Sequence, residues 1–173
     1  MNKDQIRKIF VESTSSDELF DMFVNSLKLE INEFEHYAPL FSNPVLSVDE
    51  IKMFADKLSR VLNNDVSKMY LLVGEVFFDR YLFQDAFEFF QKSFFTESSN
   101  YVPLLNILGL YNYDYDDPLN HKVLDFILTN INKVNKKSVV YLELAKVYKK
   151  LGDINNFNKY NALSYRAGEL EED

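Results

Sequence analysis

The chain has 173 residues, a formal net charge of −8 and no cysteine. This length fits one domain or one compact repeat array, and the lack of cysteine excludes disulfides, thiolate metal sites and cysteine nucleophiles. The negative charge argues against nucleic acid as the main ligand, since binding to phosphates needs a basic surface. The sequence shows neither a signal peptide nor a run of about 20 apolar residues, so we expect a cytoplasmic protein without membrane insertion.

Helices with short connections are predicted along almost the whole chain. Only four glycines and four prolines occur, and apolar residues recur every three or four positions. Ser15 with Glu18, and Ser47 with Glu50, have the spacing of a capping box, in which the Ser oxygen and the Glu carboxylate each accept a backbone N–H. The predicted helices cover residues 3–13, 16–37, 48–63, 66–80, 83–97, 101–112, 118–134, 137–151 and 154–168.

One segment of 34 residues, Ser67–Asn100, carries a pattern of large and small side chains on two predicted helices. Two helices approach closely only where the side chains are small, and large residues fill the remaining space. The positions concerned are Tyr70, Val73, Gly74, Phe77, Ala86, Phe90 and Ser93. Both the length and these positions resemble the tetratricopeptide (TPR) repeat. The resemblance implies stacked helix pairs, because one pair cannot bury its aromatic face alone.

A second match to the TPR pattern begins near Ser138. Gly152 is expected to adopt the left-handed conformation that ends a helix. The second helix of this pair departs from the pattern, with Phe157 at a small position and Asn161 at an aromatic one. The matching positions of its first helix are Tyr141, Leu144, Ala145 and Tyr148.

A weak unit lies between these two, starting at Val102. Leu108 and Gly109 fit its first helix, but His121 falls on a small position of the second. The resemblance therefore covers residues 67–168 with uneven quality.

Glu33 and His36 form Glu-x-x-His, half of a helical di-iron motif. Such a site needs a second Glu-x-x-His, and the only other histidine of the sequence, His121, is not preceded by Glu at that spacing. We therefore interpret His36 as a surface or capping residue, and expect no metal, no cofactor and no catalytic residue.

Three aspartates before Pro118 resemble a cation-binding loop, namely Asp114, Asp116 and Asp117. An EF-hand loop needs Gly at its sixth position and Glu at its twelfth, where this chain has Leu119 and Asp125. A helix cap ahead of Pro118 is the favoured interpretation.

In TPR-like arrays the first helix of each pair lines a concave groove. That groove would have an apolar floor, an acidic end and a basic end, because residues 136–166 carry 7 basic and 2 acidic side chains. The residues expected to line it are Lys68, Leu71, Glu75, Phe78, Asp79, Asn106, Leu110, Tyr113, Leu142, Lys146, Lys149 and Lys150. Such a surface suits a peptide or a helix with apolar anchors. An alternative is that helix 101–112 covers Phe78.

The resemblance also implies which ligand is not expected. TPR clamps for the acidic tails of heat-shock chaperones use Lys and Asn where this chain has Leu71 and Glu75. An acidic tail would be repelled at Glu75.

The sequence therefore predicts an all-α fold: a right-handed α-solenoid of TPR-like antiparallel helix pairs with an N-terminal helical extension. The extension covers residues 1–64, the array 65–168 and an acidic tail 169–173. The expected function is binding of another protein or peptide, as an adaptor, scaffold or assembly factor without catalysis. Two alternatives stay open: a small TPR secretion chaperone, or a structural subunit of a large bacterial machine. The oligomeric state is not predicted.

Overall fold

The computed structural model describes residues 2–62, 64–113 and 117–171, and the chain is all-α, with 76% helix and no strand in the described part. It forms two compact units, Met1–Tyr81 (unit 1) and Leu82–Asp173 (unit 2). The described helices are all too short or too polar to cross a membrane. The predicted boundary after residue 64 and the separate tail depend on the repeat resemblance and stay predictions.

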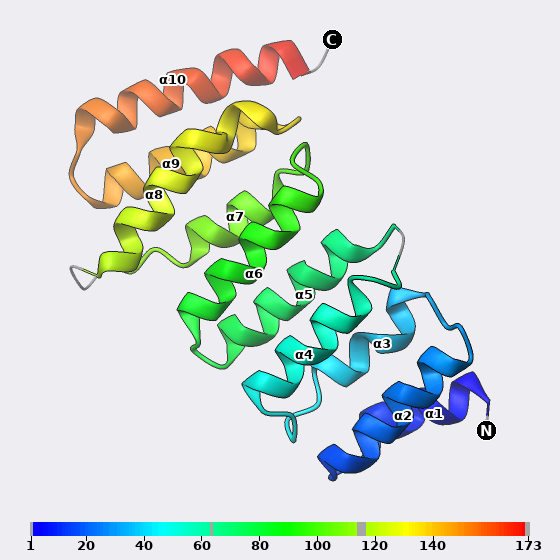
Figure 1. The fold of residues 1–173 in the computed structure, drawn as a ribbon. Coiled ribbons are helices and arrows are strands. Elements are labelled where there is room, and N and C mark those ends of the chain that lie inside the picture. Colours follow the sequence, from blue (N-terminus) through cyan, green and yellow to red (C-terminus); the bar gives the residue numbers. More distant parts are fainter. Residues whose placement is uncertain (1, 63, 114–116, 172–173) are drawn as a thin grey trace. The chain divides into compact units, whose positions relative to one another are not determined.

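Unit 1 consists of five described helices (Figure 1). They are α1 Lys3–Glu12, α2 Ser16–Lys28, α3 Phe34–Phe41, α4 Val48–Leu58 and α5 Val66–Asp79. The capping box predicted at Ser47 and Glu50 is present at the start of α4. At the start of α2, Ser15 accepts the N–H of Glu18, whereas the Glu18 carboxylate accepts from Ser13.

The predicted helix 16–37 is wrong, because the chain turns between α2 and α3. Glu30 has a φ of +54°, in the left-handed region, and the N–H of Ile31 bonds the carbonyl of Ser26 at 3.2 Å. The apolar residues keep a helical spacing across this turn, so periodicity alone does not reveal it. The turn instead depends on tertiary packing, since it brings the ring of Tyr37 to 6.0 Å from that of Phe23.

Aromatic rings fill the interior of unit 1. The Phe23 and Phe54 ring centroids are 4.6 Å apart, and those of Phe10 and Tyr37 are 6.2 Å apart. The Tyr37 hydroxyl donates to the carbonyl of Ile31 at 2.7 Å, which satisfies a polar group that packing would otherwise isolate.

Two polar side chains hold the connections of unit 1. The Asn43 amide donates to the carbonyls of Phe10 at 3.1 Å and Ser13 at 3.0 Å, at the end of α1. The Arg80 guanidinium donates to the carbonyls of Leu46 at 2.8 Å and Asn43 at 3.1 Å. The segment between α3 and α4, which contains Asn43, is therefore bonded both to the end of α1 and to the residue that follows α5.

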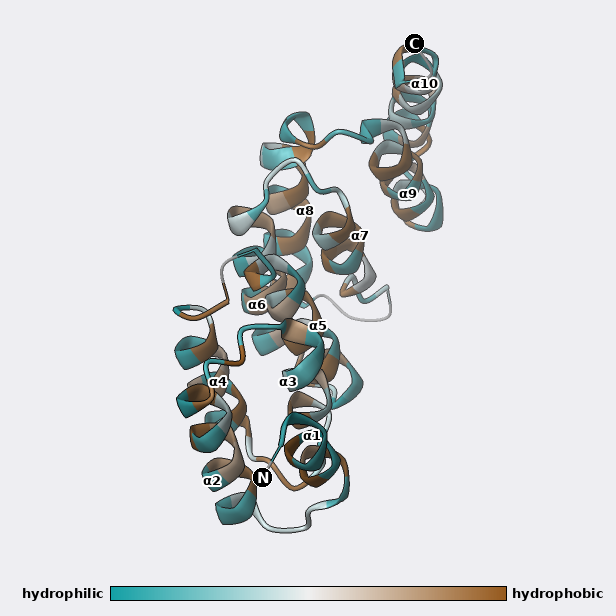
Figure 2. Cartoon of the chain, turned by 90° about the vertical axis from the view of Figure 1, so that its right-hand side faces the viewer, coloured by the Kyte–Doolittle hydropathy of each residue, from teal (hydrophilic) through white to brown (hydrophobic). Residues whose placement is uncertain are grey.

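Unit 2 contains the remaining described helices. They are α6 Phe83–Thr96, α7 Val102–Gly109, α8 Pro118–Asn130, the 3₁₀ turn Ile131–Lys133, α9 Lys137–Lys150 and α10 Ile154–Glu171. Apolar residues make up most of α7 (Figure 2). The clearest TPR-like segment is divided between the units, since α5 ends unit 1 and α6 begins unit 2.

Helices α9 and α10 form an antiparallel pair (Figure 1). Gly152 in the turn has a φ of +74°, as expected, and the next N–H bonds the carbonyl of Tyr148 at 3.0 Å. At the other end the Ser164 hydroxyl donates to the carbonyl of Ser138 at 2.8 Å. Gly168 lies beside Ser138 as well, so small residues line the close approach of the two helices.

Candidate functional site

The residues expected to line the groove lie in both units. Of the five on α5, Leu71 is half-buried and the others are exposed, namely Lys68, Glu75, Phe78 and Asp79. In unit 2, Leu142, Lys146 and Lys149 are exposed on α9 and Asn106 is half-buried on α7. Leu110 is only 5% exposed and so offers almost no surface to a partner.

The structure places three of these residues, Tyr113, Lys146 and Lys150, in one groove between α7 and α9. This α7–α9 groove has a volume of about 350 Å³. Its lining residues are Leu105, Leu108, Gly109, Tyr111, Tyr113, Glu143, Lys146, Val147 and Lys150. Sites of this size suit a few side chains of a bound peptide.

The floor of the α7–α9 groove is apolar. Leu108 and Val147 are buried beneath it, and Leu105 is half-buried. Gly109, at the end of α7, has open space where a side chain would stand. The surface at Gly109 is therefore open to a side chain of a bound peptide.

Two tyrosines and a lysine form the rim. The Tyr111 and Tyr113 ring centroids are 5.1 Å apart, and the Lys150 ammonium lies 4.4 Å from the centroid of the Tyr113 ring. Partial burial, followed by the nearby Tyr111 and Glu143, raises the pKa of the Tyr113 hydroxyl. Tyr113 therefore stays protonated at neutral pH and can donate a hydrogen bond to a ligand.

An amide pair fixes the segment that carries these tyrosines. Asn120, near the start of α8, accepts the N–H of Asn112 at 2.8 Å and donates to its carbonyl at 2.7 Å. Asn120 is buried, so these bonds are shielded from water. The rim is positioned by α8 rather than left as an unsupported loop.

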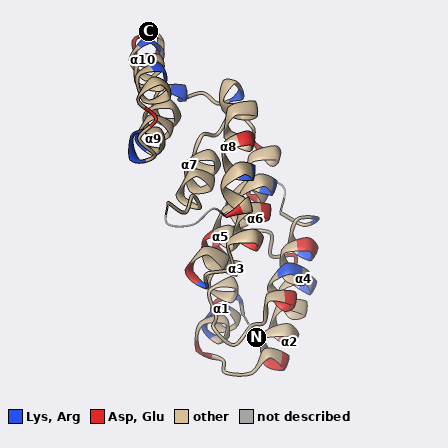
Figure 3. Cartoon of the chain, turned by 90° about the vertical axis from the view of Figure 1, so that its left-hand side faces the viewer, with Lys and Arg blue, Asp and Glu red and all other residues tan. Residues whose placement is uncertain are grey.

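Positive charge dominates this side of the groove. Lys146 pairs with Glu143 at 2.6 Å, and Lys149 lies 5.5 Å from the Phe157 ring centroid. Lys149 and Lys150 occupy the last turn of α9, where cations interact favourably with the helix dipole (Figure 3). The groove can therefore bind a carboxylate at its rim and an apolar side chain at its floor.

The residues expected to pack within repeats are mostly buried. Val73, Gly74 and Phe77 are buried on α5, and Tyr70 is half-buried. On α6 and α9 the buried residues are Ala86, Phe90, Ser93, Leu144 and Ala145.

Tyr160 is a packing residue that the repeat pattern missed. It is buried in α10 and stacks on Tyr141 and Tyr148 of α9, with ring centroids 6.2 and 5.4 Å apart. The pattern placed the large residue at Asn161, one position later. Helical spacing within α10 could have found it, since Phe157, Tyr160 and Ser164 lie three and four residues apart.

His36 is not the surface or capping residue that we expected. It is 1% exposed, its Nε2 lies 3.0 Å from the Ser26 hydroxyl, and its Nδ1 has no hydrogen-bond partner among the described residues. Burial, with smaller contributions from Lys3 and Arg7 and an opposing one from Asp4, lowers its pKa to about 4. Periodicity missed this position because the turn before α3 rotates His36 inward.

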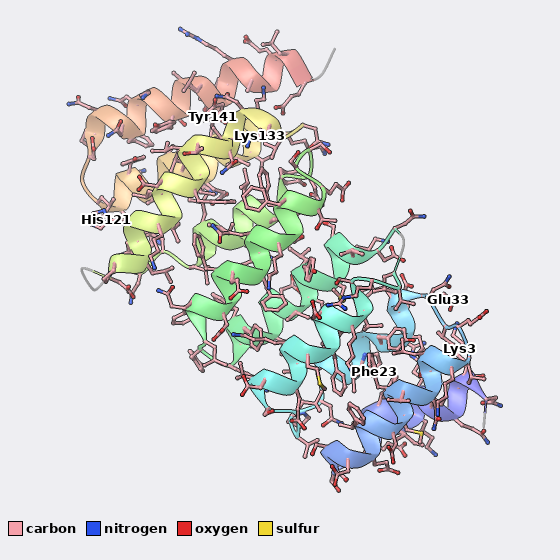
Figure 4. All side chains as sticks on the ribbon, in the orientation of Figure 1. Lys3, Phe23, Glu33, His121, Lys133 and Tyr141 are labelled. Atoms are coloured by element: carbon pink, nitrogen blue, oxygen red, sulfur yellow. The ribbon has the colours of Figure 1, made fainter. Side chains whose placement is uncertain are left out.

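Glu33, the other half of the Glu-x-x-His pattern, pairs instead with Lys3 (Figure 4). Within the described chain, no three His, Asp or Glu side chains lie close enough to hold a metal ion together. Asp114 and Asp116 lie outside the described residues. Asp117 caps α8, as expected, by accepting the N–H of Leu119 at 2.8 Å.

Comparison with known proteins gives no match: no family model, no curated protein and no solved structure is similar to this chain at a significant level.

Proposed function

We propose that the protein is a non-enzymatic module that binds another protein through the α7–α9 groove. The proposal includes a right-handed array of TPR-like helix pairs with an N-terminal helical extension. The antiparallel α9–α10 pair, with small residues at its close approach, supports such an array. An adaptor, scaffold or assembly factor would use the groove to hold a peptide or helix of its partner.

One observation carries this proposal: an apolar floor and a rim of tyrosine and lysine lie in a single groove. Aromatic side chains held in place by packing are frequent anchors of protein interfaces. Here Tyr113 is placed by the Asn112–Asn120 pair and lies under Lys150. The ligand that fits is a peptide with an apolar side chain and a neighbouring carboxylate.

Site-specific photo-crosslinking tests the proposal in cells that make the protein. A photoreactive phenylalanine in place of Tyr113 should capture a partner. The same photoreactive residue in place of Tyr165, which is 71% exposed on α10, should not capture it. The partner is then purified and titrated by calorimetry. Lys150→Glu should weaken its binding by about tenfold, because an attractive charge becomes repulsive.

Arg166→Glu is the matched control, since it reverses another exposed charge of unit 2 on α10. Equal capture at Tyr165, or a partner that binds Lys150→Glu as tightly as the unchanged protein, would overturn the proposal.

A specific observation also favours a second candidate, the structural subunit of a larger assembly. Such a subunit needs more than one interaction surface, and Phe95 on α6 is 63% exposed outside the α7–α9 groove. Co-purification of one partner would favour the adaptor, and co-purification of several stoichiometric partners would favour the subunit.

A further inference from the structure

A second surface of unit 2 exposes aromatic rings between α6 and α8. The ring of Phe126 on α8 lies 5.9 Å from that of Phe87, 5.6 Å from that of Phe94 and 5.6 Å from that of Phe95. All three contacts are edge-to-face. This cleft, here called the aromatic cleft, has a volume of about 650 Å³ and is lined by Phe87, Gln91, Phe95, Lys122, Phe126 and Lys133 among others.

The aromatic cleft lies between α6 and α8, two helices that run in the same direction (Figure 1). On α6 its residues recur every four positions, at Phe87, Gln91 and Phe95. At 1.5 Å per residue this stripe is about 12 Å long, which corresponds to about two helical turns. Valleys between packed helices accept the side chains of a third helix.

A lysine lies near each end of the aromatic cleft. Lys122 is in the first part of α8, directly after His121, and Lys133 is in the turn that follows the helix (Figure 4 labels His121 and Lys133). Within the described chain Lys122 has no ion pair, and Lys133 donates to the Asn130 side chain at 2.8 Å. Asp125 is the one carboxylate in the lining, so the cleft keeps an excess of positive charge.

We propose that the aromatic cleft binds a short amphipathic helix of another protein, with acidic residues on both sides of a two-turn apolar stripe. The exposed ring of Phe95 and the half-buried ring of Phe126 contact the apolar stripe. Lys122 and Lys133 pair with the acidic ends. Charge selects the ligand, and the aromatic floor supplies most of the affinity. This surface is separate from the α7–α9 groove, so the inference does not depend on the proposed function.

A displayed library of randomised helical peptides, selected on the immobilised full chain, tests the proposal. The selected peptides should carry acidic residues on both sides of a two-turn apolar stripe. Their affinity should fall by about tenfold or more with Phe95→Asp, and similarly with Lys122→Glu combined with Lys133→Glu. Binding should also weaken as salt is added, because the paired charges are near solvent.

Phe95 and the two lysines are exposed, so these variants should keep the fold, and circular dichroism and thermal unfolding check this. Tyr165→Asp is the matched control for Phe95→Asp, since it places the same charge on another exposed ring. It should leave affinity unchanged.

Four outcomes would overturn the proposal. The first is that no peptide is selected, and the second is that the selected peptides show no excess of acidic ends. The third is that the selected peptides bind Phe95→Asp normally but lose affinity for Lys150→Glu. That result would assign the peptides to the α7–α9 groove, and the proposed function would still hold. The fourth is self-association by sedimentation that Phe95→Asp abolishes, which makes a second copy the occupant.

Discussion

The two units differ in what their interiors contain. Unit 1 encloses an ionisable imidazole, His36, and an amide, Asn43, that binds two carbonyls. In the described part of unit 2, the buried polar residues are Ser93, Asn120 and Asn130, none of which ionises. Unit 1 should therefore respond to acid and to single polar substitutions. In unit 2 the exposed rings of Phe95 and Tyr113 line the two surfaces that we propose for partners.

The largest expected effect is the loss of an interior ring of unit 1. Phe23→Ala should lower the free energy of unfolding by about 3–5 kcal/mol, because it leaves a cavity between Phe54 and Tyr37. Guanidinium unfolding followed by circular dichroism measures the loss. The control Phe20→Ala, at a ring 38% exposed on the same helix, should cost about 1 kcal/mol. Equal losses would show that the interior of unit 1 is not packed around Phe23.

The second largest expected effect is a loss of stability in acid, which should arise in unit 1. The pKa of His36 is lowered from 6.5 to about 4 in the folded protein. Between these pH values the imidazole is therefore protonated in the unfolded chain and neutral in the folded protein. The free energy of unfolding has its full value from this source above pH 6.5 and falls by up to about 3 kcal/mol as the pH drops towards about 4. Unfolding curves over this pH range should show the loss, and His36→Gln should remove that part of it.

His121, which is exposed on α8, supplies the control for this prediction. The change in pH dependence made by His36→Gln is compared with the change made by His121→Gln. If the two variants behave alike, the acid sensitivity of the protein has a source other than the burial of His36.

Asn43→Ala should have a smaller effect, about 1–3 kcal/mol, because two carbonyls at the end of α1 lose their donor. Asn158→Ala, at an exposed position of α10 in unit 2, should change stability by less than about 0.5 kcal/mol. Thermal unfolding of the two variants compares them directly. A harmless Asn43→Ala would mean that α1 does not depend on this connection.

The smallest effect concerns a backbone conformation in unit 2. Gly152→Ala should cost about 1 kcal/mol, because Gly152 has a φ of +74°, which a side chain disfavours. Gly168→Ala, inside α10 and with only an ordinary contact to Ser138, should be neutral or stabilising. Chemical denaturation of both variants tests the difference in sign.

Sequence reasoning found the helices where local signals mark their ends. Ser47 with Glu50, and Gly152 in its turn, are local chemistry that the structure confirms. It failed between α2 and α3, where Glu30 takes a left-handed conformation that only the packing of Tyr37 and His36 explains. For the same reason it missed the inward position of His36.

The candidate site was predicted in part. Repeat spacing placed Tyr113, Lys146 and Lys150 on one surface, and all three line the α7–α9 groove. Spacing could not place Leu110, which is buried, or reveal that Asn120 holds the Tyr111–Tyr113 segment from eight residues away. The aromatic cleft was missed because the repeat pattern indicates which side chains pack within a helix pair, but not how far rings such as Phe95 and Phe126 stay exposed.

The stacked tyrosines of α9 and α10 also have a spectroscopic consequence. The chain has no tryptophan, so its 11 tyrosines dominate the near-ultraviolet absorption and emission. The Tyr148 and Tyr160 rings lie 5.4 Å apart at an angle of 10°, close enough for their electronic transitions to couple. Near-ultraviolet circular dichroism should therefore report the pairing of the last two helices without any added label.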